Sequence, residues 1–144
     1  MMKKDLIQLF NQALELEHAA SLQYLSHAEV IRGLNSELVV ERLKEISGDE
    51  LKHAAKFRSL ISMLGGVPST SISKTYNVKT VKEILETNLK CEKEAIDFYK
   101  KILDSLNNCK ELKYEDFYII KNLEDVIIDE MEHVQELKVL LGKI

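Results

Sequence analysis

The sequence predicts an all-α fold, a bundle of four helices in which two antiparallel pairs are joined by a long crossover. Apolar residues recur at alternating spacings of four and three along four segments, which is the period of helices that pack against one another. A single Pro, five Gly and no Trp are typical of long helices and exclude a turn-rich β-sandwich. A length of 144 residues, with 45% hydrophobic and 31% charged residues, indicates one domain, residues 1–144, with a packed core.

The first helix pair is predicted from two amphipathic segments separated by a short break. The first segment runs from Lys3 to about Arg32, and Gly33 suits its C-terminal end. The Asn and Ser that follow can begin the second helix, which extends to about Leu64. The segment Gly65–Pro68 then stops it, since neither Gly nor Pro favours a helix interior.

The second pair follows a connection that has no helical period. This connection, residues 65–79, is long enough to travel the length of a bundle, so the helices on either side of it need not be antiparallel neighbours. Thr80 and Glu83 have the spacing of a capping box at the start of the third helix, which runs to about Leu106. The fourth helix is predicted over residues 113–141.

Charge and hydropathy exclude two classes of partner. The net charge of -4, from 24 acidic and 20 basic residues, gives no basic field to attract nucleic acid. No segment reaches the ~18–20 consecutive apolar residues of a membrane span, and the first residues lead into an amphipathic pattern without a signal-peptide region. We therefore expect no nucleic-acid partner, no membrane partner and a cytoplasmic location. Two cysteines, Cys91 and Cys109, are too few for a four-thiolate metal site.

Four acidic residues and two histidines interrupt the apolar stripes near the midpoints of the helices. Because the midpoints of antiparallel helices lie at the same height, these side chains are expected to converge inside the bundle. No Lys or Arg on the same stripes offsets the carboxylates, so their burial demands a compensating charge. Two divalent metal ions would balance four carboxylates, with neutral imidazoles completing the coordination. The predicted metal-binding residues are Glu17, Glu50, His53, Glu94, Glu130 and His133.

The motif Glu-x-x-His occurs twice among these residues. It places two ligands three residues apart on one helical face, and it is found at Glu50–His53 and at Glu130–His133. Each motif follows a helix with one carboxylate on its inner stripe, which is the arrangement of di-iron carboxylate bundles. Oxygen and imidazole ligands without thiolates suit iron or manganese, and zinc less specifically. The predicted cofactor is therefore two iron ions per chain.

On these residues, and over nearly the whole chain, the sequence resembles the ferritin-like superfamily. It is most similar to the branch of bacterioferritins, thioferritins (Dps-like) and rubrerythrins, whose di-iron site lies within one subunit. The resemblance implies one histidine, His53 or His133, on each iron. It also implies a bridging and a terminal pair of carboxylates. These pairs, in either order, are Glu50 with Glu130 and Glu17 with Glu94.

Bacterioferritins are also similar in the surroundings of these positions. A tyrosine follows the first Glu by seven residues, here Tyr24 after Glu17. The resemblance implies that Tyr24 lies beside the metals in a catalytic role, as a hydrogen-bond donor or a one-electron donor. Asp49 and Asp129 precede the two motifs, and either orient the imidazoles or are ordinary exposed carboxylates. The Met that holds haem in the family is Leu51 here, so no haem is expected.

The function that the resemblance implies is a ferroxidase, which oxidises Fe(II) with O2 or H2O2 for iron storage or detoxification. The sequence has no fifth helix after Leu141, which favours a homo-oligomer that is a dodecamer or a dimer over a 24-subunit cage. The alternative is a rubrerythrin-like di-iron peroxidase or a di-iron oxygenase acting as a dimer. Asp97 either matches an additional rubrerythrin ligand or lies on a solvated face.

The remaining polar residues have ordinary interpretations beside functional ones. Cys91 lies one turn from Glu94 and is either a small buried hydrophobe or a redox thiol. A disulfide between Cys91 and Cys109 is not expected, because Cys109 lies near the turn after the third helix, roughly 20 Å along the axis from the metal level that Cys91 adjoins. Tyr99 is expected to pack in the core, and His27, like His18, to lie at a surface or an interface.

Overall fold

The computed structural model describes residues 1–143 and confirms the four-helix bundle. Within those residues there are four α-helices, one short 3-10 helix and no strand. The α-helices are α1 (Lys3–Val30), α2 (Ser36–Met63), α3 (Val81–Ser105) and α4 (Glu115–Leu140), and the 3-10 helix η1 covers Leu106–Asn108. The predicted bounds of the helices agree with these to within about two residues.

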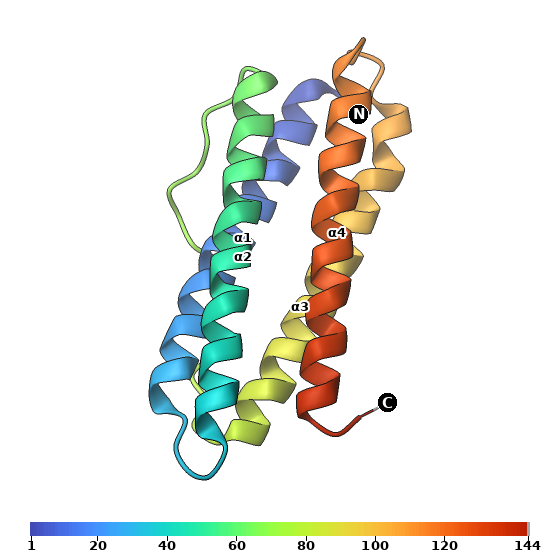
Figure 1. Cartoon of the computed structure of the whole chain (residues 1–144). Coiled ribbons are helices and arrows are strands. Elements are labelled where there is room, and N and C mark those ends of the chain that lie inside the picture. Colours follow the sequence, from blue (N-terminus) through green and yellow to red (C-terminus); the bar gives the residue numbers. More distant parts are fainter. Residues whose placement is uncertain (144) are drawn as a thin grey trace.

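The crossover gives the bundle its connectivity. α1 packs mainly on α2, and α3 packs mainly on α4. The chain leaves the end of α2 and runs along the outside of the bundle to the opposite end, where α3 begins (Figure 1). As a result α2 and α3 run parallel, as the length of the connection predicted. The start of α3 is fixed by the predicted capping box: the Thr80 hydroxyl accepts from the Glu83 N–H at 3.1 Å, and the Glu83 carboxylate accepts from the Thr80 N–H at 3.3 Å.

Polar side chains of α1 hold the crossover in place. The Asn11 side chain accepts from the Ser69 N–H at 2.7 Å, and the Gln23 side chain accepts from the Tyr76 N–H at 2.8 Å. His27 lies 2.7 Å from the Tyr76 carbonyl through its Nε2. His27 is therefore buried, at 2% exposure, and not on the surface as the sequence suggested, because the crossover covers it.

Apolar layers enclose the middle of the bundle from both ends. On one side Phe10, Phe57 and Tyr99 stack with ring centroids 6.0 and 5.2 Å apart. On the other side Leu43 and Ile46 are fully buried. Such layers exclude water from the two ends of the bundle, so polar groups between them depend mainly on one another or on a bound ion.

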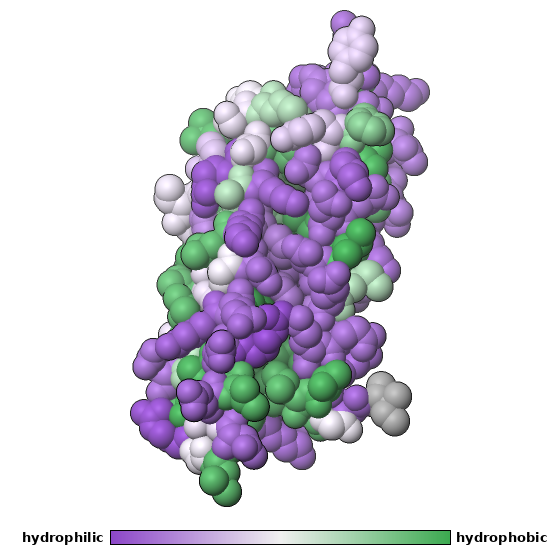
Figure 2. All heavy atoms as spheres, viewed as in Figure 1, coloured by the Kyte–Doolittle hydropathy of each residue, from purple (hydrophilic) through white to green (hydrophobic). Residues whose placement is uncertain are grey.

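The outer surface is mostly polar. On the face drawn in Figure 2, hydrophilic residues cover most of the surface and apolar residues gather mainly toward its lower end. No helix within residues 1–143 combines the length and apolar character required to cross a membrane.

The inner face of α3 differs from the one predicted. The prediction placed Cys91, Glu94 and Phe98 inward, whereas the structure buries Asn88, Glu92 and Tyr99. Two polar residues lie on the true inner face, so its apolar pattern is interrupted. A neighbouring stripe that contains Cys91 and Phe98 has the same period, so the spacing alone did not decide between the two faces.

Candidate metal centre

Six buried side chains from all four helices meet at the middle of the bundle. Each is at most 3% exposed. They form two overlapping groups, in each of which one candidate ligand atom per residue lies within 4.8 Å of the others. One group contains Glu17, Glu50, His53 and Glu130, and the other contains Glu50, Glu92, Glu130 and His133. Glu50 and Glu130 belong to both groups and therefore lie between two potential ion positions.

The first group is centred on the Nδ1 atom of His53. This nitrogen lies 3.1 Å from Glu130 Oε1, 3.2 Å from Glu50 Oε1 and 3.5 Å from Glu17 Oε2. The three oxygens come from three different helices, α4, α2 and α1. Such an arrangement can surround one cation.

The second group repeats this arrangement around His133. Its Nδ1 atom lies 3.3 Å from Glu130 Oε1 and 3.5 Å from both Glu50 Oε1 and Glu92 Oε1. The two imidazole rings are 6.1 Å apart between centroids. The two groups are thus related by an approximate two-fold axis that passes between Glu50 and Glu130.

The outer nitrogens of both imidazoles are held by aspartates of the opposite helix. His53 Nε2 lies 2.9 Å from Asp129 Oδ2, and His133 Nε2 lies 3.0 Å from Asp49 Oδ2. With each Nε2–H donating to its aspartate, Nδ1 is directed toward the centre, where it can bind a cation once its own proton is displaced. The structure therefore supports the orienting interpretation of Asp49 and Asp129.

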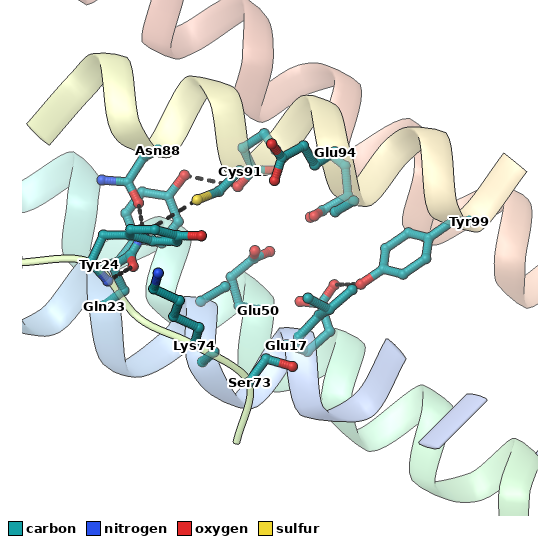
Figure 3. A pocket seen from close by; sticks show the side chains of 17 residues that line it. Glu17, Gln23, Tyr24, Glu50, Ser73, Lys74, Asn88, Cys91, Glu94 and Tyr99 are labelled. Atoms are coloured by element: carbon teal, nitrogen blue, oxygen red, sulfur yellow. Dashed lines mark hydrogen bonds between the residues drawn. The ribbon is translucent and has the colours of Figure 1, made fainter. Parts of the chain in front are cut away.

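Two tyrosines hold the outer carboxylates in a second crosswise arrangement. The Tyr99 hydroxyl of α3 donates to Glu17 Oε1 of α1 at 2.7 Å, and the Tyr24 hydroxyl of α1 donates to Glu92 Oε1 of α3 at 2.8 Å. Figure 3 shows the two phenol rings on opposite sides of Glu50. Burial, followed by repulsion from neighbouring carboxylates, raises the pKa of both tyrosines well above the ordinary value, so they stay protonated donors.

Six buried atoms of this centre make no hydrogen bond, and each residue of the two groups supplies one of them. They are Glu17 Oε2, Glu50 Oε1, His53 Nδ1, Glu92 Oε2, Glu130 Oε1 and His133 Nδ1. A buried polar atom without a partner is costly, and six of them in one cluster are costlier still. Two divalent cations would satisfy all six, and the set of oxygen and imidazole donors fits iron or manganese.

The protonation of the centre without metal shows how strongly it needs positive charge. Burial and then repulsion from Glu130 raise the pKa of Glu17 to about 7 and that of Glu92 to about 8. Burial lowers the pKa of His53, but contacts with Glu130 and Glu17 outweigh it and raise that pKa to about 11. His133 behaves in the same way, with a pKa of about 11. Protons therefore occupy the metal-free centre, and a cation must displace them.

The structure brings five of the six predicted metal-binding residues together and corrects the sixth. The Glu94 side chain is 62% exposed, and its carboxylate lies 4.0 Å from the Lys90 ammonium. Glu92 occupies the position that the prediction gave to Glu94. Residues two positions apart on a helix point in directions about 200° apart around its axis, so Glu92 and Glu94 cannot both face inward. Asp97 is also exposed, which favours the solvated-face interpretation of that residue.

A sequence signal for Glu92 exists in the internal repeat. Tyr24 follows Glu17 by seven residues, and Tyr99 follows Glu92 by the same interval. Seven residues are about two helical turns, so each pair lies on one face. The seven-residue interval from Glu to Tyr in the first helix therefore selects Glu92 in the third helix. It also predicts that Tyr99, like Tyr24, makes a hydrogen bond to a carboxylate. Tyr99 is buried as predicted, but it contacts the centre as well as the core.

A cavity of about 190 Å³ leads from the surface to these carboxylates. It lies between α1, α3 and the crossover, with Lys74 and Ser73 contributed by the crossover (Figure 3). Cys91 lines it and is half-buried, and both Cys91 and Cys109 are free thiols. Burial raises the pKa of the Cys91 thiol, which favours the inert interpretation of this residue.

Comparison with known proteins agrees with the geometry. A family model described as a ferritin-like domain matches residues 7–144. The bacterioferritin of Brucella melitensis is 31% identical over 143 residues, which cover 96% of this chain and 85% of that protein. The bacterioferritin of Mycobacterium leprae is 27% identical over 139 residues, covering 96% of this chain and 84% of that protein.

Solved structures agree as well. A ferritin-like, di-iron-carboxylate protein from Bacillus anthracis str. Ames matches with a TM-score of 0.88 at 29% identity, covering 96% of both chains. The bacterioferritin of Desulfovibrio desulfuricans matches with a TM-score of 0.85 at 24% identity, covering 96% of this chain and 78% of that one, a likeness of fold. With the family model matching almost the whole chain, the chain belongs to the ferritin-like domain family.

Proposed function

We propose that the protein is a ferroxidase that binds two Fe(II) ions per chain and oxidises them with O2 or H2O2, for iron storage or detoxification. The observation that carries the proposal is the set of six unpartnered, buried donor atoms arranged around two positions. The relatives named bacterioferritin and the di-iron-carboxylate protein of Bacillus anthracis support iron over manganese or zinc. Residues 1–144 form a single di-iron domain in this proposal.

The geometry supports a definite assignment of ligands. Glu17 and His53 would hold one ion, Glu92 and His133 would hold the other, and Glu50 and Glu130 would bridge them. Four carboxylates balance two divalent ions, so the loaded site carries no net charge. The bridging pair is thus Glu50 with Glu130, one of the two orders that the sequence left open, and Glu92 replaces Glu94 in the terminal pair.

The protein's own residues supply the remaining requirements of the reaction. The aspartates orient the imidazoles, and Tyr24 and Tyr99 fix the terminal carboxylates. Tyr24 is buried directly beside Glu92 and is placed to donate a hydrogen bond or one electron during oxidation. Leu51 is exposed on α2, and the absence of haem and the cytoplasmic location both stay predictions.

The assignment of Glu92 predicts a difference between two neighbouring carboxylates of α3. We expect Glu92→Gln to lower the number of bound Co(II) ions from two per chain to one, because Glu92 belongs to only one group. Glu94→Gln is the matched control and should retain both ions, since its carboxylate is exposed. Co(II) bound after gel filtration can be counted by elemental analysis. Loss of an ion in Glu94→Gln alone would contradict the assignment.

The native mass of the protein distinguishes an iron-storage protein from a ferroxidase that stores no iron. We expect a homo-oligomer, and light scattering of the purified protein measures it. A shell of twelve chains of 16.6 kDa weighs roughly 200 kDa, and only a closed shell has an interior for mineral. A dimer, at about 33 kDa from the same chain mass, would contradict storage while leaving the two-ion site and its oxidation of Fe(II) in place.

A further inference from the structure

The cavity beside the centre has one closed end and one open end. Its inner wall includes Glu17, Glu50 and Glu130, which are almost fully buried, and its outer wall includes Lys74 and Glu94, which are exposed. A molecule from solvent can therefore reach the carboxylates between α1 and α3. The crossover borders this path and is fixed there by its hydrogen bonds to α1.

The cavity is larger than the oxidants of the proposed function require. Its volume is about 190 Å³, whereas a cavity needs only about 10–15 Å³ to hold one water molecule. O2 and H2O2 each have two heavy atoms and are only slightly larger than water. Small side chains are part of its lining: Ala19 and Ala20 on α1, and Ala95 on α3.

The wall of the cavity combines apolar and polar side chains. Leu16 and the three alanines line it with methyl and methylene groups, which offer no hydrogen bond to a polar solute. The inner end holds carboxylates and the hydroxyls of Tyr24 and Tyr99. A ligand that matches both regions has a short apolar body and a compact polar group directed toward the centre.

For an oxidant of Fe(II), the molecule that has this shape is an organic hydroperoxide. Resting on the proposed ferroxidase function, we infer that the protein reduces small alkyl hydroperoxides, with the alkyl group in the cavity between α1 and α3 and the peroxide directed toward the carboxylates. The O–O bond breaks, two Fe(II) ions give up one electron each, and two protons are taken up. The products are two Fe(III) ions, one alcohol and one water.

The kinetic test compares two oxidants in one protein. Fe(II) is loaded anaerobically and mixed with H2O2 or with tert-butyl hydroperoxide, and Fe(III) formation is followed by absorbance. We expect both to react, with two Fe(II) oxidised per hydroperoxide. The organic product should be tert-butyl alcohol. Acetone would instead indicate one-electron cleavage by iron in solution, which would overturn the inference.

Filling the cavity should change the selectivity between the two oxidants. We expect Ala95→Leu and, separately, Ala20→Leu to lower the rate ratio of tert-butyl hydroperoxide to H2O2 by about tenfold or more, since a pocket discriminates by size to that degree. Ala55→Leu is the control, because Ala55 lies exposed on α2 outside the cavity lining. An unchanged ratio in both filling variants would overturn the placement of the alkyl group.

A metal-free measurement separates this inference from the function on which it rests. Saturation-transfer NMR should detect tert-butyl alcohol bound to the metal-free protein, and the signal should be lost in Ala95→Leu and retained in Ala55→Leu. If H2O2 or O2 oxidises bound Fe(II) but tert-butyl alcohol does not bind and its hydroperoxide does not react, the inference fails and the ferroxidase proposal stands. If no oxidant reacts, the ferroxidase proposal itself fails.

Discussion

Glu50→Gln should lower the rate of Fe(II) oxidation by about 100-fold or more while leaving the metal-free protein folded and stable. Removing a partner that merely orients a metal ligand costs ~10–100-fold, and Glu50 contributes directly to both groups. Without metal, burial and repulsion from Glu130 and Glu17 raise the pKa of Glu50 well above the usual range. Its side chain is then a neutral acid, which the amide of Gln imitates in shape and charge.

Glu130 differs from Glu50 in its protonation without metal, so the two substitutions should have different effects on stability. Burial acts against its ionisation, but contacts with His133 and His53 outweigh burial and lower the pKa of Glu130. It is therefore an anion that contacts two imidazolium ions in the metal-free centre. Glu130→Gln removes that charge, so we expect it to abolish oxidation and also to lower the thermal midpoint, unlike Glu50→Gln.

The measurement pairs stopped-flow absorbance of Fe(III) formation with thermal denaturation of the metal-free proteins. Glu41→Gln serves as the control, because Glu41 lies exposed on the same helix as Glu50. Oxidation by Glu50→Gln at a rate near that of the unmodified protein would exclude a bridging role for Glu50. Equal destabilisation of the metal-free protein by both substitutions would contradict the different protonation of the two residues.

The sequence carried enough information for the fold and for most of the centre. Helix periodicity and the capping box at Thr80 predicted the four helices closely. The two Glu-x-x-His motifs predicted four of the clustered residues, because a three-residue interval on a helix allows one geometry only. Glu17 was found because its neighbours on the inner stripe of α1, such as Ala13 and Tyr24, are apolar or aromatic.

The third helix shows the limit of that reasoning. Its inner face carries Asn88, which bonds to His27 and Gln23, in addition to Glu92. These partners belong to α1 and become neighbours only after the bundle forms, so the sequence of α3 gives no reason to bury an amide there. The cavity is a second case. Its lining includes Ala20 of α1 and Ala95 of α3, which are 75 residues apart in the chain and come together only in the folded bundle.

Binding of two divalent ions should raise the thermal midpoint of the protein by about 10–20 °C. A ligand at one hundred times its Kd stabilises the folded state by about 2.7 kcal/mol per site. A chain of this size gains a few degrees for each kcal/mol. Co(II) is a suitable ion because it binds nitrogen and oxygen donors without reacting further. The ions would satisfy the six unpartnered atoms, so stabilisation and site occupancy should rise together.

The same stabilisation should be larger at pH 8 than at pH 6. In the folded, metal-free protein Glu17 and Glu92 have pKa values of about 7 and about 8, whereas a Glu of the unfolded chain has a pKa of 4.5. Between these values the folded protein therefore holds protons that the unfolded chain has released. The stability that these two carboxyl groups contribute to the metal-free protein is fully present below pH 4.5 and is lost as the pH rises through 7 and 8. The metal-free protein is therefore less stable at pH 8, while the ions meet fewer competing protons and bind more tightly.

Proton release gives an independent measure of this competition. At pH 7 the metal-free centre holds protons on Glu50 and Glu92, partly on Glu17, and on both imidazoles. Loading two ions should release about four protons per chain, which an indicator dye in weakly buffered solution can count. Glu50→Gln lacks one of these protons and should bind little metal at all. Release of about one proton per ion or fewer, which the imidazoles alone would supply, or a larger thermal shift at pH 6 than at pH 8, would mean that the carboxylates are already ionised without metal. The buried cluster would then be stabilised by something other than the cations it is proposed to bind.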